Sequence, residues 1–196
     1  MSATRLLVLG AIRIRQPIHG YEVRKELASW RLETRTNVKP GSVYGAIRTL
    51  EKDGCLAVHG AVAGDHRPER TQYVVTAEGE TEFQTLLREA WWTVSPPKEP
   101  LIPALAMMRH LSREELVRAL AARAGALSDE LDTLRLLRAT IKDGATGAEG
   151  DIPDHVREIV DYVAVRTRAE LGWTTGLQRR LREGRYTFAD EQPSQA

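Results

Sequence analysis

The order of the short elements in the first 76 residues constrains the fold more than any other feature of this sequence. Three helical patterns come first, at residues 4–12, 16–30 and 39–54, and two runs of β-forming residues follow, at 55–60 and 70–75. Gly, Asp and Pro between the two runs indicate a turn, so the runs are predicted to form a hairpin. Three short helices and a hairpin of this length are typical of a winged helix-turn-helix domain.

The ends of these helices are indicated by the residues beside them. Thr4 is a candidate N-cap of the first helix, and the second helix is expected to begin again after Pro17. Asp53-Gly54 closes the third helix, since glycine is the usual residue after a helix end. Thr76, followed by acidic residues in the first turn, predicts a fourth helix at residues 76–94.

The rest of the chain is predicted to be helical. The proline-rich stretch "SPPKEP", residues 95–100, is the best boundary between two domains. Ser112 and Glu115 form a capping box, which opens a pattern of apolar residues spaced three and four apart, as in a coiled coil. Pro153 opens a last helix, and Gly184 is its stop. The predicted parts are a winged-helix domain with its trailing helix at 1–94, a linker at 95–100, a helical domain at 101–185 and a flexible tail at 186–196. The predicted fold class is therefore mainly α, with an α+β winged helix followed by a helical domain.

The composition of the 196 residues excludes several classes of protein. A hydrophobic content of 42% and a charged content of 28% are those of a globular protein. Cys55 is the one cysteine, so the chain has no internal disulfide and no zinc site made of several cysteines. No apolar run approaches the roughly 18 residues of a membrane span, and no cleavage site follows the short apolar stretch after Arg5, so we expect a cytoplasmic protein. The histidines are too scattered for a metal site, and the motifs predict no cofactor and no enzyme.

Charge is distributed unevenly along the chain, although the formal net charge is only +1. Residues 1–76 hold 12 Lys and Arg against 7 Asp and Glu, whereas the remainder holds 16 against 20. A basic first domain favours a polyanionic partner, and the acidic remainder favours a different role for the helical domain.

The third helix, "KPGSVYGAIRTLEKDG", has two different faces. At 100° per residue, one face carries an apolar stripe, which is expected to be buried. The members of this stripe are Val43, Ala46, Ile47 and Leu50. The opposite face carries Gly41, Gly45, Arg48 and Lys52, and Tyr44 lies beside it. Because glycine inside a helix costs roughly 0.5–1 kcal/mol relative to alanine, Gly45 indicates the close approach of another surface.

Double-stranded DNA suits this second face. The free N–H groups at the helix start attract phosphate, and Ser42 and Tyr44 can donate to phosphate oxygens. Arg48 can reach a base edge, while Lys39 and Lys52 can contact phosphates at either end. An amphipathic helix with a solvated face is the alternative for this helix taken alone.

The turn of the hairpin is a candidate second contact with DNA. His66, Arg67 and Arg70 gather where the tip of a wing would lie, and exposed cations there can reach the backbone or the minor groove. Asp65 and Glu69 oppose this interpretation locally, and a solvated polar loop is the alternative.

The stretches "PIHGYEVRKEL", "KPGSVYGAIRTLEKDG", "RPERTQY" and "TAEG" together resemble the PadR family of bacterial transcriptional regulators, in order and in spacing. The resemblance covers residues 5 to about 90, and the helical region beyond looks like that of the longer PadR-like subgroup. It implies a homodimeric winged-helix repressor that binds a palindromic operator, with the C-terminal helices making the dimer. Family members are released by phenolic acids, drugs or other small molecules, or by no known ligand, so the resemblance supplies no inducer, and release by a small-molecule ligand is our own expectation. Activation in place of repression stays open.

The resemblance also assigns roles to individual residues. Tyr44 matches the tyrosine of the recognition helix, with Lys39, Ser42 and Arg48 as its neighbours. His19, Gly20 and Tyr21 match the "HGY" that opens the second helix, and Arg67 and Arg70 match the basic wing. The chain has Glu69, Thr71 and Gln72 where many members have a more basic wing.

Several other residues keep two interpretations. Trp91 and Trp92 can stack on a planar ligand, or they can pack between the two domains, which we favour because adjacent helical residues point to different faces. Trp173 is expected to pack rather than to bind a ligand. Cys55 is expected to be a buried apolar residue, with a redox-sensing thiol as the alternative. For the whole chain, a winged-helix adaptor that binds proteins instead of DNA is the alternative function.

Overall fold

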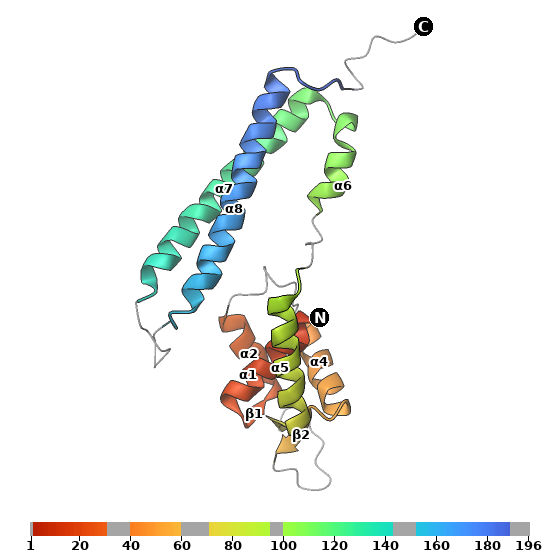
Figure 1. Cartoon of the computed structure of the whole chain (residues 1–196), viewed down its shortest axis with the longest axis vertical. Helices are drawn as coiled ribbons and strands as arrows, with labels where there is room; N and C mark the ends of the chain where they lie inside the picture. The colour runs from red at the N-terminus through yellow and green to blue at the C-terminus, as the bar shows by residue number, and fades with distance from the viewer. Residues whose placement is uncertain (1, 31–39, 60–70, 95–99, 143–151, 189–196) are drawn as a thin grey trace. The chain divides into compact units, whose positions relative to one another are not determined.

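The computed structural model describes residues 2–30, 40–59, 71–94, 100–142 and 152–188 (Figure 1). The chain divides into two compact units, Met1–Pro97 and Lys98–Ala196. The predicted linker lies at this division, although residues 95–99 are outside the described residues.

The first unit holds four helices and three strands among its described residues. They are α1 (Ala3–Arg15), β1 (Ile18–His19), α2 (Gly20–Ser29), α4 (Pro40–Lys52), β2 (Leu56–His59), β3 (Gln72–Val75) and α5 (Ala77–Trp92). This order of three helices, a β2–β3 hairpin and a trailing helix confirms the prediction of a winged helix-turn-helix within a mainly α chain.

The sheet has three antiparallel strands in the order β1-β3-β2, not the two strands that were predicted. Ile18 pairs with Tyr73 and His19 with Gln72, while Leu56 pairs with Val75 across the hairpin. The prediction that one helix runs from 16 to 30 is therefore wrong at its start. Two residues are too few to show the alternation of a strand, and β1 exists because β3 offers it a free edge.

The helix starts differ in one more place and agree in others. The N-cap of α1 is Ser2, whose Oγ accepts a hydrogen bond from Arg5 N at 3.4 Å, and not Thr4. Thr76 caps α5 as predicted, since its Oγ1 accepts from Gly79 N at 3.0 Å. Gly54 has a φ of 75°, so the predicted stop after α4 is confirmed.

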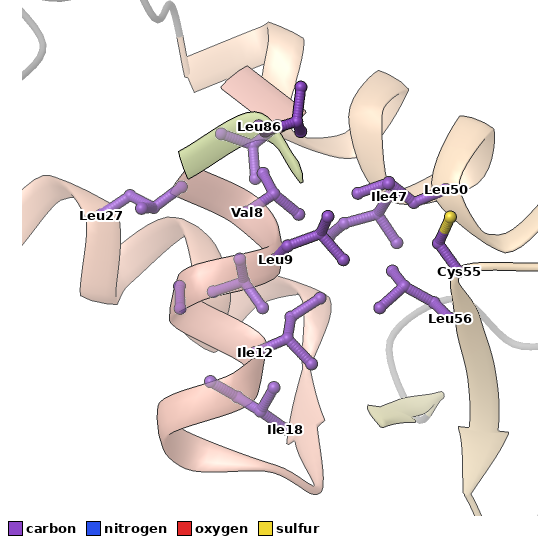
Figure 2. Packing of buried hydrophobic residues seen from close by; sticks show 13 residues of the cluster. Val8, Leu9, Ile12, Ile18, Leu27, Ile47, Leu50, Cys55, Leu56 and Leu86 are labelled. Atoms are coloured by element: carbon purple, nitrogen blue, oxygen red, sulfur yellow. The ribbon is translucent and has the colours of Figure 1, made fainter. Parts of the chain in front are cut away.

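The core of the first unit is built around α1 (Figure 2). Val8, Leu9 and Ile12 are fully buried and contact the buried faces of the neighbouring helices. The other buried members are Ala11, Ile18, Val23, Leu27, Val43, Ile47, Leu50, Cys55, Leu56 and Leu86. Cys55 is thus a buried residue at the start of the hairpin, as predicted.

The second unit is a helical hairpin with a short helical segment before it. Its elements are α6 (Leu101–Ala106), the 3₁₀ turn η1 (Met108–His110), α7 (Arg113–Thr140) and α8 (Val156–Arg182). Arg123 pairs with Glu170 and Arg138 with Asp161, so α7 and α8 run antiparallel (Figure 1).

The ends of the hairpin helices follow the predicted signals closely. Ser112 caps α7 through a hydrogen bond from Glu115 N to its Oγ at 3.2 Å. α8 begins at Val156, three residues after Pro153, and Gly184 follows its end with a φ of 75°. The apolar pattern predicted after Ser112 is buried at Leu127 and Leu131 of α7, among others, and Val160, Thr167, Thr174 and Leu177 are buried on α8.

The flexible tail predicted from residue 186 begins too early. Phe188 is fully buried against Leu120, Leu177 and Leu181, and Tyr186 packs against the same cluster. Arg113 holds this segment, because it donates to the carbonyl of Tyr186 and its guanidinium lies 5.0 Å from the centre of the Phe188 ring. Residues 186–188 therefore belong to the helical unit.

Candidate nucleic-acid interface

The two faces predicted for α4 are those of the structure. Val43, Ile47 and Leu50 are buried against the core, and Ala46 is partly buried. Helix α4 is thereby fixed to the domain along one side, and its opposite side is left outward.

The outward side of α4 carries the predicted binding residues together. Gly41, Ser42, Tyr44, Arg48 and Lys52 are all exposed, and Gly45 is half-buried between them. Within the described part of the chain no ion pair engages Arg48 or Lys52, so their charge is available to a partner.

The glycines of this face have no internal steric reason. A Cβ added at Gly41 or Gly45 would meet no other atom within 4 Å. Each glycine lowers helix stability relative to alanine without making room for another part of the chain described here. Because neither position carries a side chain, another molecule can lie close to the helix backbone there.

Tyr44 also joins α4 to the start of α2. Its ring lies 3.5 Å from the position of a Cβ on Gly20, which is buried and also touches Ile47. The Tyr44 ring thus rests on the N-terminal turn of α2 while 41% of the residue stays exposed. A side chain much larger than a methyl group at position 20 would displace the ring.

The start of α2 adds two aromatic rings to the same region. The rings of His19 and Tyr21 stack with centroids 5.7 Å apart and planes 18° apart. Tyr21 is exposed, and the amide of His19 donates to Glu22 Oε2 at 3.0 Å, which fixes the turn. The Nδ1 atom of His19 is buried and has no hydrogen-bond partner among the described residues.

The sheet contributes one tyrosine near the C-terminal part of α4. Burial raises the pKa of Tyr73 on β3, the charge of Glu51 raises it further, and Arg48 offsets part of the shift. Tyr73 therefore stays protonated beside Glu51 and Arg48 and remains a neutral hydrogen-bonding group.

Four of the predicted contacts cannot be placed. Lys39 and the wing residues His66, Arg67 and Arg70 lie outside the described residues. The structure thus brings together His19, Tyr21, Gly41, Ser42, Tyr44, Gly45, Arg48 and Lys52, on the starts of two helices and along one of them.

Two exposed cations on α2 were not singled out from the sequence. Arg24 and Lys25 follow Tyr21 by three and four residues, so they share its side of the helix. This spacing from a predicted contact residue was the signal that could have identified them. They add two exposed cations on the side of α2 that carries Tyr21.

Trp91 and Trp92 end α5, and each is 80% exposed within the first unit. Neither ring packs on the core of that unit. Trp173, by contrast, packs against the cluster around Leu177 and Phe188, as predicted.

The arrangement suits the binding of an anion. An anion can meet the backbone N–H groups at the start of α4, hydroxyl groups beside them and cations along the helix. Among the described residues, no three His, Cys, Asp or Glu gather as a metal site would require. Within the same residues, no helix is both long and apolar enough to cross a membrane.

Comparison with known proteins relates the first unit to a family. Residues 8–85 match the model of the transcriptional regulator PadR-like family, while no curated protein sequence matches the chain. Among solved structures, PadR of Bacillus subtilis in complex with operator DNA is similar, with a TM-score of 0.63 and 19% identity over 92% of this chain and 98% of that chain.

Two further crystal structures share the fold. The same Bacillus subtilis protein in complex with p-coumaric acid gives a TM-score of 0.59 and 15% identity, over 92% of this chain and 98% of that chain. A PadR-like transcriptional regulator from Bacillus cereus gives a TM-score of 0.57 and 17% identity, over 90% of this chain and 94% of that chain. Residues 8–85, which make up most of the winged helix, therefore match the PadR-like family of transcriptional regulators, and the chain as a whole shares the fold of these structures.

Proposed function

We propose that this protein is a sequence-specific DNA-binding regulator that acts as a homodimer on a palindromic operator. The observation that carries the proposal is the outward face of α4. Two glycines there leave open space beside Tyr44, Arg48 and Lys52, and nothing else in the described chain uses that space. A protein-binding face would carry more exposed apolar side chains, so DNA is favoured over an adaptor role.

The proposed contacts are of two kinds: some position the protein on the DNA backbone, and others recognise the base sequence. Ser42, Tyr44 and Lys52 are proposed to hold phosphates, with Lys39 and the wing residues Arg67, Arg70 and His66 as outer contacts. Arg48 is proposed to read a base edge in the major groove. Tyr21 and His19 are proposed to contact the DNA backbone beside the start of α4.

The homodimer is supported by an outward stripe on α8. Tyr162, Val165, Ala169, Gly172 and Gly176 follow one another at spacings of three and four, opposite the face that packs on α7. Tyr162 and Val165 are more than half exposed, and a Cβ on Gly172 would meet nothing within 4 Å. An apolar stripe with small residues suits close packing of the same helix from a second copy.

Control by a small molecule is the finer part of the proposal. The structure of Bacillus subtilis PadR with p-coumaric acid concerns that protein, and it supports the idea of a planar effector here. Trp91 and Trp92 offer exposed flat rings on which such a molecule can stack. Effector binding would lower operator affinity by favouring a dimer whose two recognition helices no longer fit the DNA. The outcome at the promoter is proposed to be repression.

A gel-shift titration with duplexes selected from a random library tests DNA binding. Arg48→Ala is expected to weaken binding and to relax the preference at one base pair, which costs about 1–3 kcal/mol when mismatched. Lys52→Ala is expected to weaken binding to every duplex alike and to reduce the dependence on salt.

Arg182→Ala, at the end of α8, removes one exposed cation elsewhere and is the control for net charge. Binding that ignores both salt and Tyr44→Ala would rule the proposed function out.

A further inference from the structure

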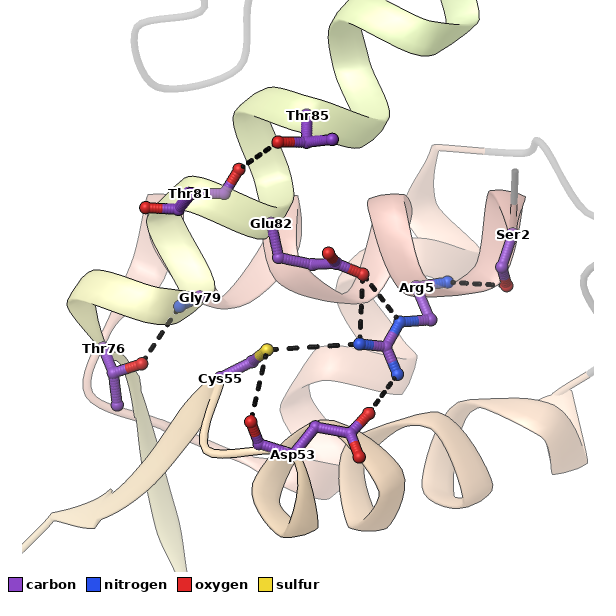
Figure 3. Close-up of polar contacts among 9 residues, drawn as sticks. All are labelled: Ser2, Arg5, Asp53, Cys55, Thr76, Gly79, Thr81, Glu82 and Thr85. Atoms are coloured by element: carbon purple, nitrogen blue, oxygen red, sulfur yellow. Dashed lines mark hydrogen bonds and ion pairs between the residues drawn. The ribbon is translucent and has the colours of Figure 1, made fainter.

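One guanidinium joins three elements of the first unit (Figure 3). Arg5 of α1 donates from Nη1 to Asp53 Oδ2 at 2.7 Å, directly after the end of α4. Its Nε donates to Glu82 Oε1 of α5 at 3.1 Å, and Nη2 lies 3.1 Å from the same oxygen. Arg5 thus bridges two carboxylates that come from the recognition helix and from the trailing helix.

The bridge is partly shielded from water. The side chain of Arg5 is 21% exposed, whereas those of Asp53 and Glu82 are 43% and 32% exposed. Burial by itself would lower the pKa of Arg5, but hydrogen bonds to Asp53 and Glu82 raise it above its usual value. Without the cation, two carboxylates would face each other in a shielded place.

Asp53 is fixed to α4 by its backbone. Its amide donates to Thr49 O at 2.9 Å, so it continues the last turn of the helix. After Gly54 turns the chain, the amide of Cys55 donates to Leu50 O at 2.8 Å. A force on Asp53 therefore acts on the end of α4 as a whole.

The start of α5 lies directly against the same turn. Thr76 Oγ1 donates to Gly54 O at 2.7 Å, and Thr76 N donates to Cys55 O at 3.2 Å. A Cβ on Gly79 would lie 2.0 Å from Cys55 O, so only glycine allows this approach. Together with the bridge, these contacts join two successive turns of α5 to the end of α4.

We propose that Arg5 is a positioning residue for DNA recognition, which makes α4 and α5 move as one body. The proposal rests on the proposed function. Helix α5 is the last element before the chain passes to the helical unit, so a displacement imposed from that unit enters the winged helix through α5. The Asp53–Arg5–Glu82 bridge passes this displacement to the recognition helix, α4. The distance between the two recognition helices of a dimer is then set by the contact between the copies, and not by movement of α4 within each winged helix.

The closing experiment measures tolerance of operator spacing with the full chain. A palindromic duplex selected by the wild-type protein is compared with the same duplex carrying one extra base pair at its centre. We expect the wild-type protein to bind the second duplex about tenfold or more weakly, which equals about 1.4 kcal/mol. Arg5→Gln is expected to shrink this ratio at least about threefold, because a looser α4 can adapt to the wrong spacing.

A matched control and a second variant separate positioning from loss of charge or of fold. Arg13→Gln removes an equal charge and the 2.7 Å ion pair of Arg13 with Glu80, which joins α1 to α5 without touching α4, so the ratio should stay at its wild-type value. Glu82→Ala severs only the α5 side of the bridge and should shrink the ratio in the same direction as Arg5→Gln.

The thiol of Cys55 supplies a readout that needs no DNA. Its Sγ lies 4.0 Å from Arg5 Nη2, and burial raises the pKa of this thiol, so alkylation by iodoacetamide should be slow in the wild-type protein. The charge of Arg5 lowers the pKa of this thiol, so its removal would by itself slow alkylation. Faster alkylation in Arg5→Gln than in Arg13→Gln, compared at equal distance from their urea midpoints, would therefore report a looser contact around Cys55, and this is the expected result.

The outcomes that overturn the proposal differ from those that overturn the proposed function. Wild-type discrimination of spacing that persists unchanged in Arg5→Gln and Glu82→Ala would overturn the positioning role alone. A wild-type protein that binds none of the duplexes would overturn the proposed function, and the positioning role with it.

Discussion

Gly79 and Gly45 are both glycines inside helices, yet they have opposite reasons to be there. Gly79 lets the first turn of α5 touch the carbonyl of Cys55, whereas Gly45 faces open space. Gly79→Ala is therefore expected to destabilise the domain by about 2 kcal/mol or more, since the clash is with backbone, which cannot rotate away. Urea unfolding followed by circular dichroism measures this loss.

Gly45→Ala is the matched control, and it tests the DNA face as well. The same added methyl group should raise the free energy of unfolding by up to about 1 kcal/mol, because alanine favours the helix. Operator affinity should nevertheless fall, because the methyl group stands where the proposed DNA backbone approaches. A variant that is more stable and binds DNA as well as the wild type would contradict the role given to Gly45.

Individual residues were predictable where a local pattern determined them. The burial of Val43, Ile47 and Leu50 follows from helical periodicity, and the cap at Thr76 follows from its neighbours. The role of Arg5 was not predictable in this way. Its partners are 48 and 77 residues away, and nothing in the local sequence distinguishes a bridging arginine from a solvated one.

Elements were predicted best where they are long and periodic. The two faces of α4 and the buried apolar pattern of α7 followed from spacing alone, but β1 did not, since a two-residue strand is created by its partner. The stripe on α8 was missed for another reason. Ala169, Gly172 and Gly176 carry no hydrophobic signal, and the role proposed for them depends on the exposure of Ala169 and Gly172 beside Tyr162 and Val165.

The C-terminal segment is an element that the sequence presented as a tail. Phe188→Ala is expected to destabilise the helical unit by about 3 kcal/mol, because it leaves a cavity against Leu120 and Leu181 and removes the ring under Arg113. The measurement is thermal or urea unfolding of the full chain. The matched control is Leu136→Ala on α7, where the side chain is 73% exposed and truncation should cost little.

Equal effects of the two substitutions would show that Phe188 is not part of the core of this unit. A larger effect of Phe188→Ala would show that the folded helical domain extends to residue 188 or beyond, past the end of α8.

At the scale of the whole molecule, the division into two units was indicated by prolines more closely than by charge. The prolines of "SPPKEP" fall at residues 95–100, where the two compact units meet along the chain, whereas the change from a basic to an acidic sequence falls near residue 76, within the first unit. The proposed contact between two copies was suggested from the sequence only through the family resemblance, because an exposed helix face carries no local signal of a second copy.

The stripe on α8 makes a prediction about assembly. Val165→Glu places a charge in the proposed contact between two copies, while in a lone chain this position is already exposed. Light scattering should show a shift from dimer to monomer, with no loss of helix content. Arg168→Glu, also exposed on α8 but beside the stripe, is the control and should leave the dimer intact.

The same variant separates dimerisation from DNA contact. A palindromic operator is held by two recognition helices about 34 Å apart, and the second helix binds at an effective concentration set by the dimer. Val165→Glu should therefore lose about 100-fold or more in affinity for the palindrome, yet bind a single half-site as well as the wild type. The comparison requires a palindromic and a half-site duplex at the same salt concentration. An equal loss on both duplexes would mean that Val165 supports the fold of the chain, and that the contact between copies lies on another face.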